Sequence, residues 1–155
     1  MTDHLHGTRR RREVLQKIQV IAIGLSGSDR VAIFEVDETG RRLIPIASSA
    51  PDVSVEPIAI GAGLIGRSVE AGEIYERYFQ PAAATSAERG LRASIPLRID
   101  GFPIGAVAIF DREGGGATSA ALDRKLIDIF ARHAATALYC TGMYERIRSA
   151  LDRNW

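Results

Sequence analysis

The sequence predicts an α+β sandwich, in which one antiparallel sheet carries a long helix from each end of the chain on the same face. Apolar residues recur every three or four positions near both ends, which is the spacing of a single buried helical stripe. Between these stretches lie apolar runs separated by turn sequences, the pattern of paired strands. Two such stripes need an apolar surface to cover them, and one face of the sheet serves both.

The first half of the chain combines one long helix with the first strands. Thr8 suits the N-cap of a helix that continues to about Leu25, and Gly27 suits its end. The following residues alternate in polarity around an Asp-Glu-Thr-Gly turn, as expected of an antiparallel pair. The expected elements are, in order, strands at 30–36 and 41–48 around the turn 37–40, a shorter strand at 53–60 and a short helix at 65–71.

The second half contains a hairpin followed by the second long helix. Strands are expected at 91–99 and 102–111, because they flank Asp100-Gly101, a dipeptide suited to a two-residue turn with positive φ. Residues 104–110 are apolar at every position, which predicts a central strand covered on both faces. The last helix is expected to run from Thr118 or Ser119 to about Ala150.

Composition and charge limit the classes of function. The 155 residues suit one domain, and a net charge of +1 gives no general attraction to nucleic acid or acidic membranes. The only cysteine, Cys140, excludes an internal disulfide and a cysteine-based zinc site. No apolar run reaches the ~20 residues of a membrane span. We therefore expect a cytoplasmic protein with no membrane segment. Arg9–Arg12 is expected to be a solvated helix start, with binding to nucleic acid as the alternative.

Several stretches together resemble the GAF domain family of small-molecule-binding modules, whose fold is related to that of PAS domains. The matching stretches, in order along the chain, are Ile60–Gly66, Ser94–Leu97, Gly101, Ile104–Gly105 and Leu126–Tyr139. The resemblance implies a central antiparallel sheet of five or six strands, with both terminal helices on one face. It also implies a lid at 70–90 over a pocket on the other face. One domain is expected at 9–155, after a disordered tail at 1–8.

The residues do not match the specialised members of this family. Bilin-binding members attach the chromophore through a lid cysteine and methionine sulfoxide reductases need several cysteines, whereas Cys140 falls on the last helix. The Asn-Lys and Phe-Asp-Glu pattern of cyclic-nucleotide binders is missing from 111–124. Haem-binding members use a pocket histidine, but His4 and His6 fall in the expected tail and His133 on the last helix. No cluster of acid, base and nucleophile is present. We therefore expect no cofactor, no metal and no enzymatic activity.

A ligand site is expected where the lid meets the sheet. Aromatic residues and arginines concentrate there, and Arg92 and Ser94 share the more polar face of their strand. Aromatic walls with one or two guanidinium groups suit a small anionic or planar ligand. In the alternative interpretation, the aromatic rings fill the pocket and the arginines face water. The predicted ligand-binding residues are Arg67, Tyr75, Tyr78, Phe79, Arg92 and Ser94.

The terminal helices predict a homodimer. The stripe of the last helix continues past the point where the sheet should end, so it needs a partner. The predicted interface residues are Val14, Ile18, Ile21, Leu25, Tyr144, Ile147 and Leu151. The sequence thus predicts a sensory or regulatory module that binds a small molecule and signals through its terminal helices, in a parallel dimer. The alternative is a dimerisation module with an empty pocket. No output domain is recognisable, so a signalling partner protein or a longer chain is expected to supply it.

Overall fold

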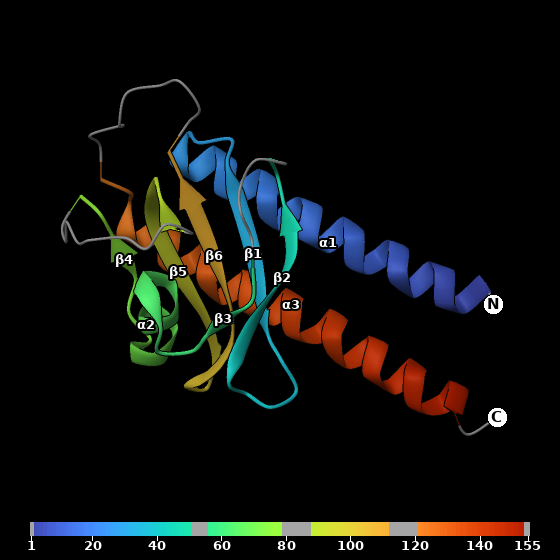
Figure 1. Cartoon of the computed structure of the whole chain (residues 1–155). Coiled ribbons are helices and arrows are strands. Elements are labelled where there is room, and N and C mark those ends of the chain that lie inside the picture. Colours follow the sequence, from blue (N-terminus) through green and yellow to red (C-terminus); the bar gives the residue numbers. More distant parts are fainter. Residues whose placement is uncertain (1, 51–55, 79–87, 112–120, 154–155) are drawn as a thin grey trace.

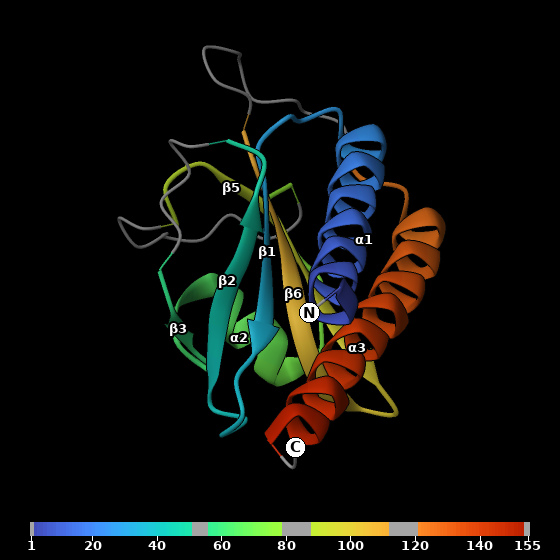
Figure 2. The ribbon, with the colours of Figure 1, turned by 90° about the vertical axis from the view of Figure 1, so that its right-hand side faces the viewer.

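A computed structural model describes residues 2–50, 56–78, 88–111 and 121–153. The chain folds into three layers: a pair of long helices, a six-stranded sheet and a short helix (Figures 1 and 2). In chain order, the elements are α1 (Thr2–Ser26), β1 (Val31–Val36), β2 (Arg42–Ser48), β3 (Ile58–Ala59), α2 (Gly63–Ala71), β4 (Tyr75–Glu76), β5 (Leu91–Ile99), β6 (Phe102–Phe110) and α3 (Arg124–Arg153).

The sheet has the strand order β3-β2-β1-β6-β5-β4, and every neighbouring pair is antiparallel. The predicted hairpin is confirmed, with Asp100 at φ 50° and Gly101 at φ 83° in the turn between β5 and β6. Strand β6 lies between β1 and β5, as its uniformly apolar sequence predicted. The shorter strand expected at 53–60 is β3, although residues 51–55 lie outside the described part of the chain.

Each face of the sheet has its own buried core. Alternating residues of one strand point to opposite faces, so Ile33 of β1 joins the core under α1 and α3 while Phe34 joins the core under α2. The α1/α3 side is mainly aliphatic, and Leu138 of α3 lies at its centre with no exposed surface. The α2 side combines aliphatic residues with aromatic rings, among them Phe110. The predicted sandwich, with both terminal helices on one face, is confirmed.

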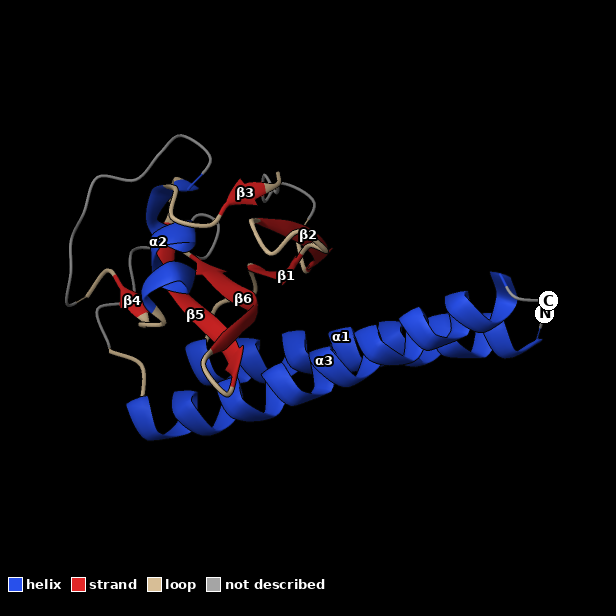
Figure 3. Ribbon diagram, turned by 90° about the horizontal axis from the view of Figure 1, so that it is seen from below, coloured by secondary structure: helices blue, strands red, loops and turns tan. Residues whose placement is uncertain are grey.

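Helices α1 and α3 run antiparallel, so the two ends of the chain lie together, and both helices extend past the sheet (Figure 3). The backbone is helical from Thr2, so the helix start predicted at Thr8 is corrected to Thr2. Residues 2–7 contain no proline, and extending an existing helix fixes only one more residue for each new hydrogen bond. The start predicted for the last helix, at Thr118 or Ser119, lies outside the described residues.

Candidate functional site

A cavity of about 230 Å³ lies between the sheet and the start of α2. Its apolar walls come from Phe34 and Phe110 on the sheet and from Ile65 on α2. Two carboxylates, Glu56 and Glu88, also line it. The cavity is on the face opposite α1 and α3, where the sequence predicted a pocket. Its polar groups are acidic rather than basic, which differs from the arginine-lined site that the sequence suggested.

Glu88 binds the start of α2 directly. Its Oε1 accepts a hydrogen bond from the backbone N–H of Leu64 at 3.0 Å, and its Oε2 accepts one from Ile65 at 2.8 Å. The N-cap residue Ala62 makes no side-chain capping bond of its own. The first N–H groups of a helix need acceptors and favour negative charge. Glu88, only 4% exposed, therefore supplies the cap of α2 from the far end of the predicted lid.

Glycine at position 63 makes this close approach possible. Gly63 has a φ of +64°, and a Cβ built on it would lie 2.8 Å from Oε1 of Glu88. A side chain there would push the carboxylate away and strain the left-handed backbone. The glycine-rich stretch 60–66 thus turns into a short helix, as predicted, and it also forms a cradle for a carboxylate. This contact could not be predicted from the sequence, because Glu88 lies 24 positions from Leu64 along the chain.

A second cavity, of about 270 Å³, brings two predicted ligand residues together. Arg67 and Tyr75 line it together with Ser68 and Glu73. Arg67 is exposed on α2, and its Nε donates to the carbonyl oxygen of Gly63 at 2.8 Å. Tyr75 is buried, and this burial raises the pKa of its phenol above the usual 10.0. Arg77 opposes this shift and Glu88 adds to it, the weakest of the three effects.

The other predicted ligand residues lie apart from these two cavities. Tyr78 is 58% exposed in the turn two residues after β4. Ser94 is fully buried on β5, and its Oγ has no hydrogen-bond partner within the described structure. Phe79 lies outside the described residues. Of the six predicted residues, the structure therefore brings Arg67 and Tyr75 into one cavity.

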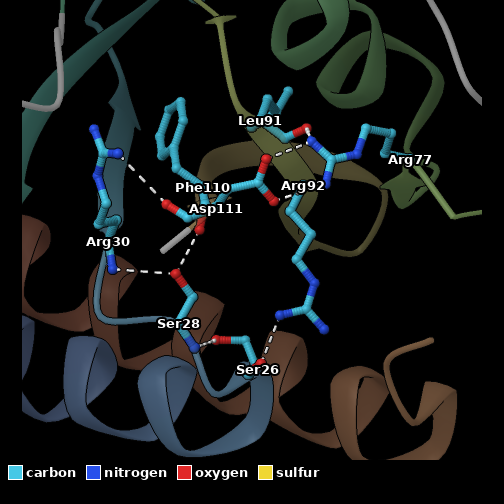
Figure 4. A network of polar contacts seen from close by, with 8 residues as sticks. All are labelled: Ser26, Ser28, Arg30, Arg77, Leu91, Arg92, Phe110 and Asp111. Carbon is cyan, nitrogen blue, oxygen red and sulfur yellow. Dashed lines mark hydrogen bonds and ion pairs between the residues drawn. The ribbon is translucent and has the colours of Figure 1, made fainter. Parts of the chain in front are cut away.

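The side chain of Arg92 points to the α1/α3 face of the sheet, opposite the two cavities on the α2 side. The register of β5 on β6 shifts between Leu91 and Ala93, and such a bulge breaks the two-residue alternation of side chains. The Nη1 of Arg92 consequently donates to the carbonyl oxygen of Ser26 at the end of α1, at 2.6 Å (Figure 4). The expectation that Arg92 and Ser94 enter one pocket is corrected by this shift.

The side chain of Arg77 lines neither of these cavities and instead binds a neighbouring strand end. Its guanidinium makes two hydrogen bonds of 2.7 Å to the carboxylate of Asp111, which ends β6 (Figure 4). This hydrogen bonding raises the pKa of Arg77. Ser28, in the α1–β1 connection, donates to the carbonyl oxygen of Phe110 in the same network. The arginines at this end of the sheet thus tie the strand ends and α1 together.

Another hollow lies on the helix layer. A groove of about 430 Å³ runs between α1 and α3. Most side chains that line it are apolar, and Lys17 and His133 are the polar exceptions. Its exposed apolar members are Ile21, Leu126 and Ile129, at 52, 48 and 52% exposure. His133, which the sequence placed on the last helix, is exposed and lines this groove.

The groove continues into an exposed apolar stripe on α3. Tyr144, Ile147 and Leu151 are 40, 53 and 50% exposed, and they follow Ala137 of the groove at helical spacing. Of the predicted interface residues on α1, Val14, Ile18, Ile21 and Leu25 all line the groove. Ile18 is only 4% exposed and belongs mainly to the core. Leu126 and Ile129 were missing from the predicted interface.

The profile of the GAF domain family matches residues 12–140 of this chain. The chain belongs to the GAF domain family. Comparison with curated protein sequences gives no match.

Solved structures of GAF domains and related proteins share the fold. A fragment of a methyl-accepting chemotaxis protein is 20% identical, with 89% of this chain and 97% of that chain covered and a TM-score of 0.63. A GAF domain/HD domain protein from Geobacter sulfurreducens is 17% identical, covering 83% and 92%, with a TM-score of 0.63. A type II free methionine-R-sulfoxide reductase from Thermoplasma acidophilum is 17% identical, covering 86% and 94%, with a TM-score of 0.64. Identities this low show the fold alone.

In this GAF domain, Arg11 joins three elements where the helices leave the sheet. Its Nη2 donates to Oε1 of Glu35 on β1 at 2.7 Å, and its Nη1 donates to Oγ1 of Thr141 on α3 at 3.2 Å. Its Nε lies 3.6 Å from Oε2 of Glu145. The other arginines of Arg9–Arg12 are exposed, so the expected solvated helix start describes three of the four.

The described parts of the GAF domain contain neither a cluster of metal ligands nor a helix that could span a membrane. No group of three or more potential metal ligands occurs in them. None of their helices has the length and apolar character needed to cross a bilayer. The thiol of Cys140 is exposed on α3, on the opposite face of the sheet from both α2-side cavities.

Proposed function

We propose that this GAF domain is a non-catalytic regulatory module that forms a homodimer through α1 and α3. The observation that carries the proposal is the continuous apolar surface made by the α1/α3 groove and the stripe on α3. Six large apolar side chains on it are between 40 and 53% exposed. An exposed apolar surface of this kind is typical of an interaction site.

A second copy of the chain is the partner that fits this surface best. The two antiparallel helices of one copy present a flat apolar face, and two such faces related by a twofold axis form a four-helix bundle. The groove holds one lysine and one histidine but no carboxylate, so it does not suit a strongly basic peptide. Stable interfaces bury about 800 Å² on each partner, which the full length of both helices can supply. The parallel arrangement places the protruding helix ends of the two copies together.

Sedimentation equilibrium at tens of micromolar tests the dimer. We expect a dimer for the wild-type chain and a monomer for Ile21→Glu and Ile129→Glu, because a dimer would bury an unpaired charge from each copy. Phe102→Glu is the matched control, since Phe102 is 72% exposed at the start of β6 and does not line the groove. A monomeric wild-type chain would refute the proposal.

A small molecule bound on the α2 side is the second candidate function, favoured by the two cavities. Their volumes, about 230 and 270 Å³, lie below the ~300–1,000 Å³ of sites for drug-sized ligands. We therefore propose a ligand of roughly amino-acid size. The Glu56/Glu88 cavity suits a neutral or amine-bearing molecule, whereas the Arg67/Tyr75 cavity suits the anionic or planar ligand expected from the sequence.

Native mass spectrometry of the purified protein, followed by denaturation, identifies any compound that it releases. Ile58→Trp narrows the Glu56/Glu88 cavity and Arg67→Ala removes a charge from the other. We expect ligand occupancy to fall with the first variant and to persist with the second. The opposite result would assign the ligand to the Arg67/Tyr75 cavity, and an empty wild-type protein would favour the dimerisation module alone.

The proposal of a non-catalytic role rests on the placement of reactive groups. One structural neighbour is a methionine sulfoxide reductase, yet the single cysteine of this chain is separated from both cavities by the sheet. We also propose that residues 9–155 form one domain and that the protein acts in the cytoplasm. There it passes a ligand signal to a partner protein. Incubation with methionine sulfoxide and a thiol reductant tests the non-catalytic role, because turnover of the sulfoxide would contradict a purely regulatory function.

A further inference from the structure

Strand β4 contributes consecutive side chains to the two faces of the sheet. Tyr75 packs into the core under α2, where it is 6% exposed. Glu76 is 2% exposed and contacts the segment that leads into α3, on the other face. Two neighbouring residues of one short strand therefore touch both outer layers of the domain.

Glu76 binds the segment just before α3 by one hydrogen bond. Its Oε1 accepts from the backbone N–H of Leu122 at 2.6 Å. Its Oε2 accepts no hydrogen bond in the described structure and lies 3.6 Å from Nη2 of Arg124, whose side chain is half exposed. Asp123 then caps the first turn of α3 by accepting from Lys125 and Leu126. Burying a carboxylate with so few partners is costly, and a movement that exposes Glu76 to water relieves part of that cost.

The attachment of β4 to the rest of the sheet is short. It is an edge strand with two paired positions, Tyr75 with Ser94 and Glu76 with Ala93. One more backbone bond follows, from Arg77 to the carbonyl oxygen of Arg92 at 2.9 Å. Short edge elements open locally at a small fraction of the global free energy of unfolding. Apart from the ion pair that Arg77, the residue after β4, makes with Asp111, few bonds hold β4, so this strand can shift while the central strands stay paired.

From this arrangement we infer that β4 couples the α2-side cavities to α3. When a molecule in the cavity displaces Tyr75, Glu76 moves with it because the two residues share one short strand. The bond to Leu122 then breaks, and the start of α3 is released on the opposite face. The inference rests on the proposed function for its biological meaning, since a ligand would supply the displacement and the α3 interface would receive it.

Hydrogen exchange of the α3 amides tests this coupling without any ligand. The measurement uses the full chain in an Ile21→Glu background, so that it depends on neither ligand binding nor dimerisation. Glu76→Ala removes the acceptor of Leu122, and we expect exchange at Leu122 to rise about two- to ten-fold, as for the loss of one hydrogen bond. Glu76→Gln keeps an acceptor oxygen, so a smaller increase is expected.

Tyr75→Ala is the decisive variant, because Tyr75 lies on the far face from α3. We expect exchange to rise at 122–127 but not at 134–141, in the middle of the helix. Leu64→Ala is the matched control, because Leu64 is equally buried and lines the same cavity as Tyr75 but lies on α2. If Tyr75→Ala does not fold, Tyr75→Leu replaces it. The inference is overturned if the Tyr75 variant changes only the α2 side, or if Leu64→Ala affects the start of α3 equally.

Discussion

The two faces of the sheet are covered in opposite ways. On one face, two long helices form a mainly aliphatic core whose inner residues have almost no exposed surface, and their outer side is again apolar. On the other face, the nine-residue α2 leaves two cavities and depends on a carboxylate from a distant segment for its cap. The backbone of the sheet is shared, so the difference comes from the covering elements and from the side chains that each face presents.

The difference in packing between the two faces suits each face to a different function. Close packing gives the α1/α3 side a defined shape, which suits a surface that must match a second copy. Cavities and single long-range hydrogen bonds make the α2 side easier to rearrange, which suits a site that responds to a ligand. The contrast predicts that equal disturbances cost more on the helix side than on the α2 side. Four substitutions test or sharpen it, in order of expected effect.

The largest effect is expected from Leu138→Ala in the helix-side core. Leu138 has no exposed surface and packs between α3 and the sheet, so the substitution leaves a cavity that close packing cannot fill. We expect a loss of about 2–5 kcal/mol in the free energy of unfolding, measured with urea. Tyr139→Ala, at a position 41% exposed on the same helix, should cost far less. Equal losses would remove the contrast between inner and outer helix residues.

The next effect is expected from Gly66→Ala on the α2 side. A Cβ at this position would overlap the carbonyl oxygen of Ala59, which is backbone and cannot rotate away. We expect a loss of about 1–3 kcal/mol from overpacking, measured by the same titration. Gly24→Ala is the control, because no atom lies within 4 Å of a Cβ there. A gain of up to ~1 kcal/mol is expected at this helical position, and a loss at both would contradict the steric explanation.

Local sequence patterns were sufficient for most of the fold. The Asp100-Gly101 turn, the uniformly apolar β6 and the stripes of the terminal helices each carry a signal within a few residues. The structure has the turn, the central strand and both helices at these places, although Ile21 and Leu126 of the predicted buried stripes are about half exposed. The bulge beside Arg92 was not predicted, because nothing in 91–93 indicates that the two-residue alternation breaks there. One shifted residue was enough to move a predicted ligand group to the wrong face.

The polar contacts of the candidate site could not be predicted for a different reason. Glu88 caps α2 across 24 positions of the chain, and Glu76 binds Leu122 across 46. Each depends on the tertiary fold, and an isolated glutamate in a loop or edge strand looks solvated in the sequence. The apolar residues of the proposed interface were easier to identify in the sequence, because Ile21, Ile147 and Leu151 follow a helical period that can be counted directly.

A smaller effect is expected from Glu88→Gln. The substitution keeps one carbonyl oxygen but removes the charge and one of the two acceptors of the Leu64 and Ile65 amides. A loss of about 0.5–2 kcal/mol is expected, the usual range for a helix cap, together with faster hydrogen exchange at these two amides. Glu73→Gln is the control, because Glu73 is exposed and comes just after α2. Unchanged exchange at Leu64 and Ile65 would show that Glu88 does not hold α2.

The smallest effect is expected from Tyr75→Phe, and it should emerge only at alkaline pH. Burial raises the pKa of Tyr75 above 10.0, so the folded chain holds the phenol proton more tightly than the unfolded chain. The resulting stability is fully present below pH 10.0 and is lost as pH rises through the raised pKa of the folded state. Phenylalanine has no proton to lose, so the variant should lose less stability than wild type when the pH rises about one unit past that value. Urea unfolding below and above pH 10.0 measures the difference, with the exposed Tyr139→Phe as control. Parallel pH dependence in wild type and Tyr75→Phe would mean that water reaches the phenol, and the α2 side would then be more open than its core packing indicates.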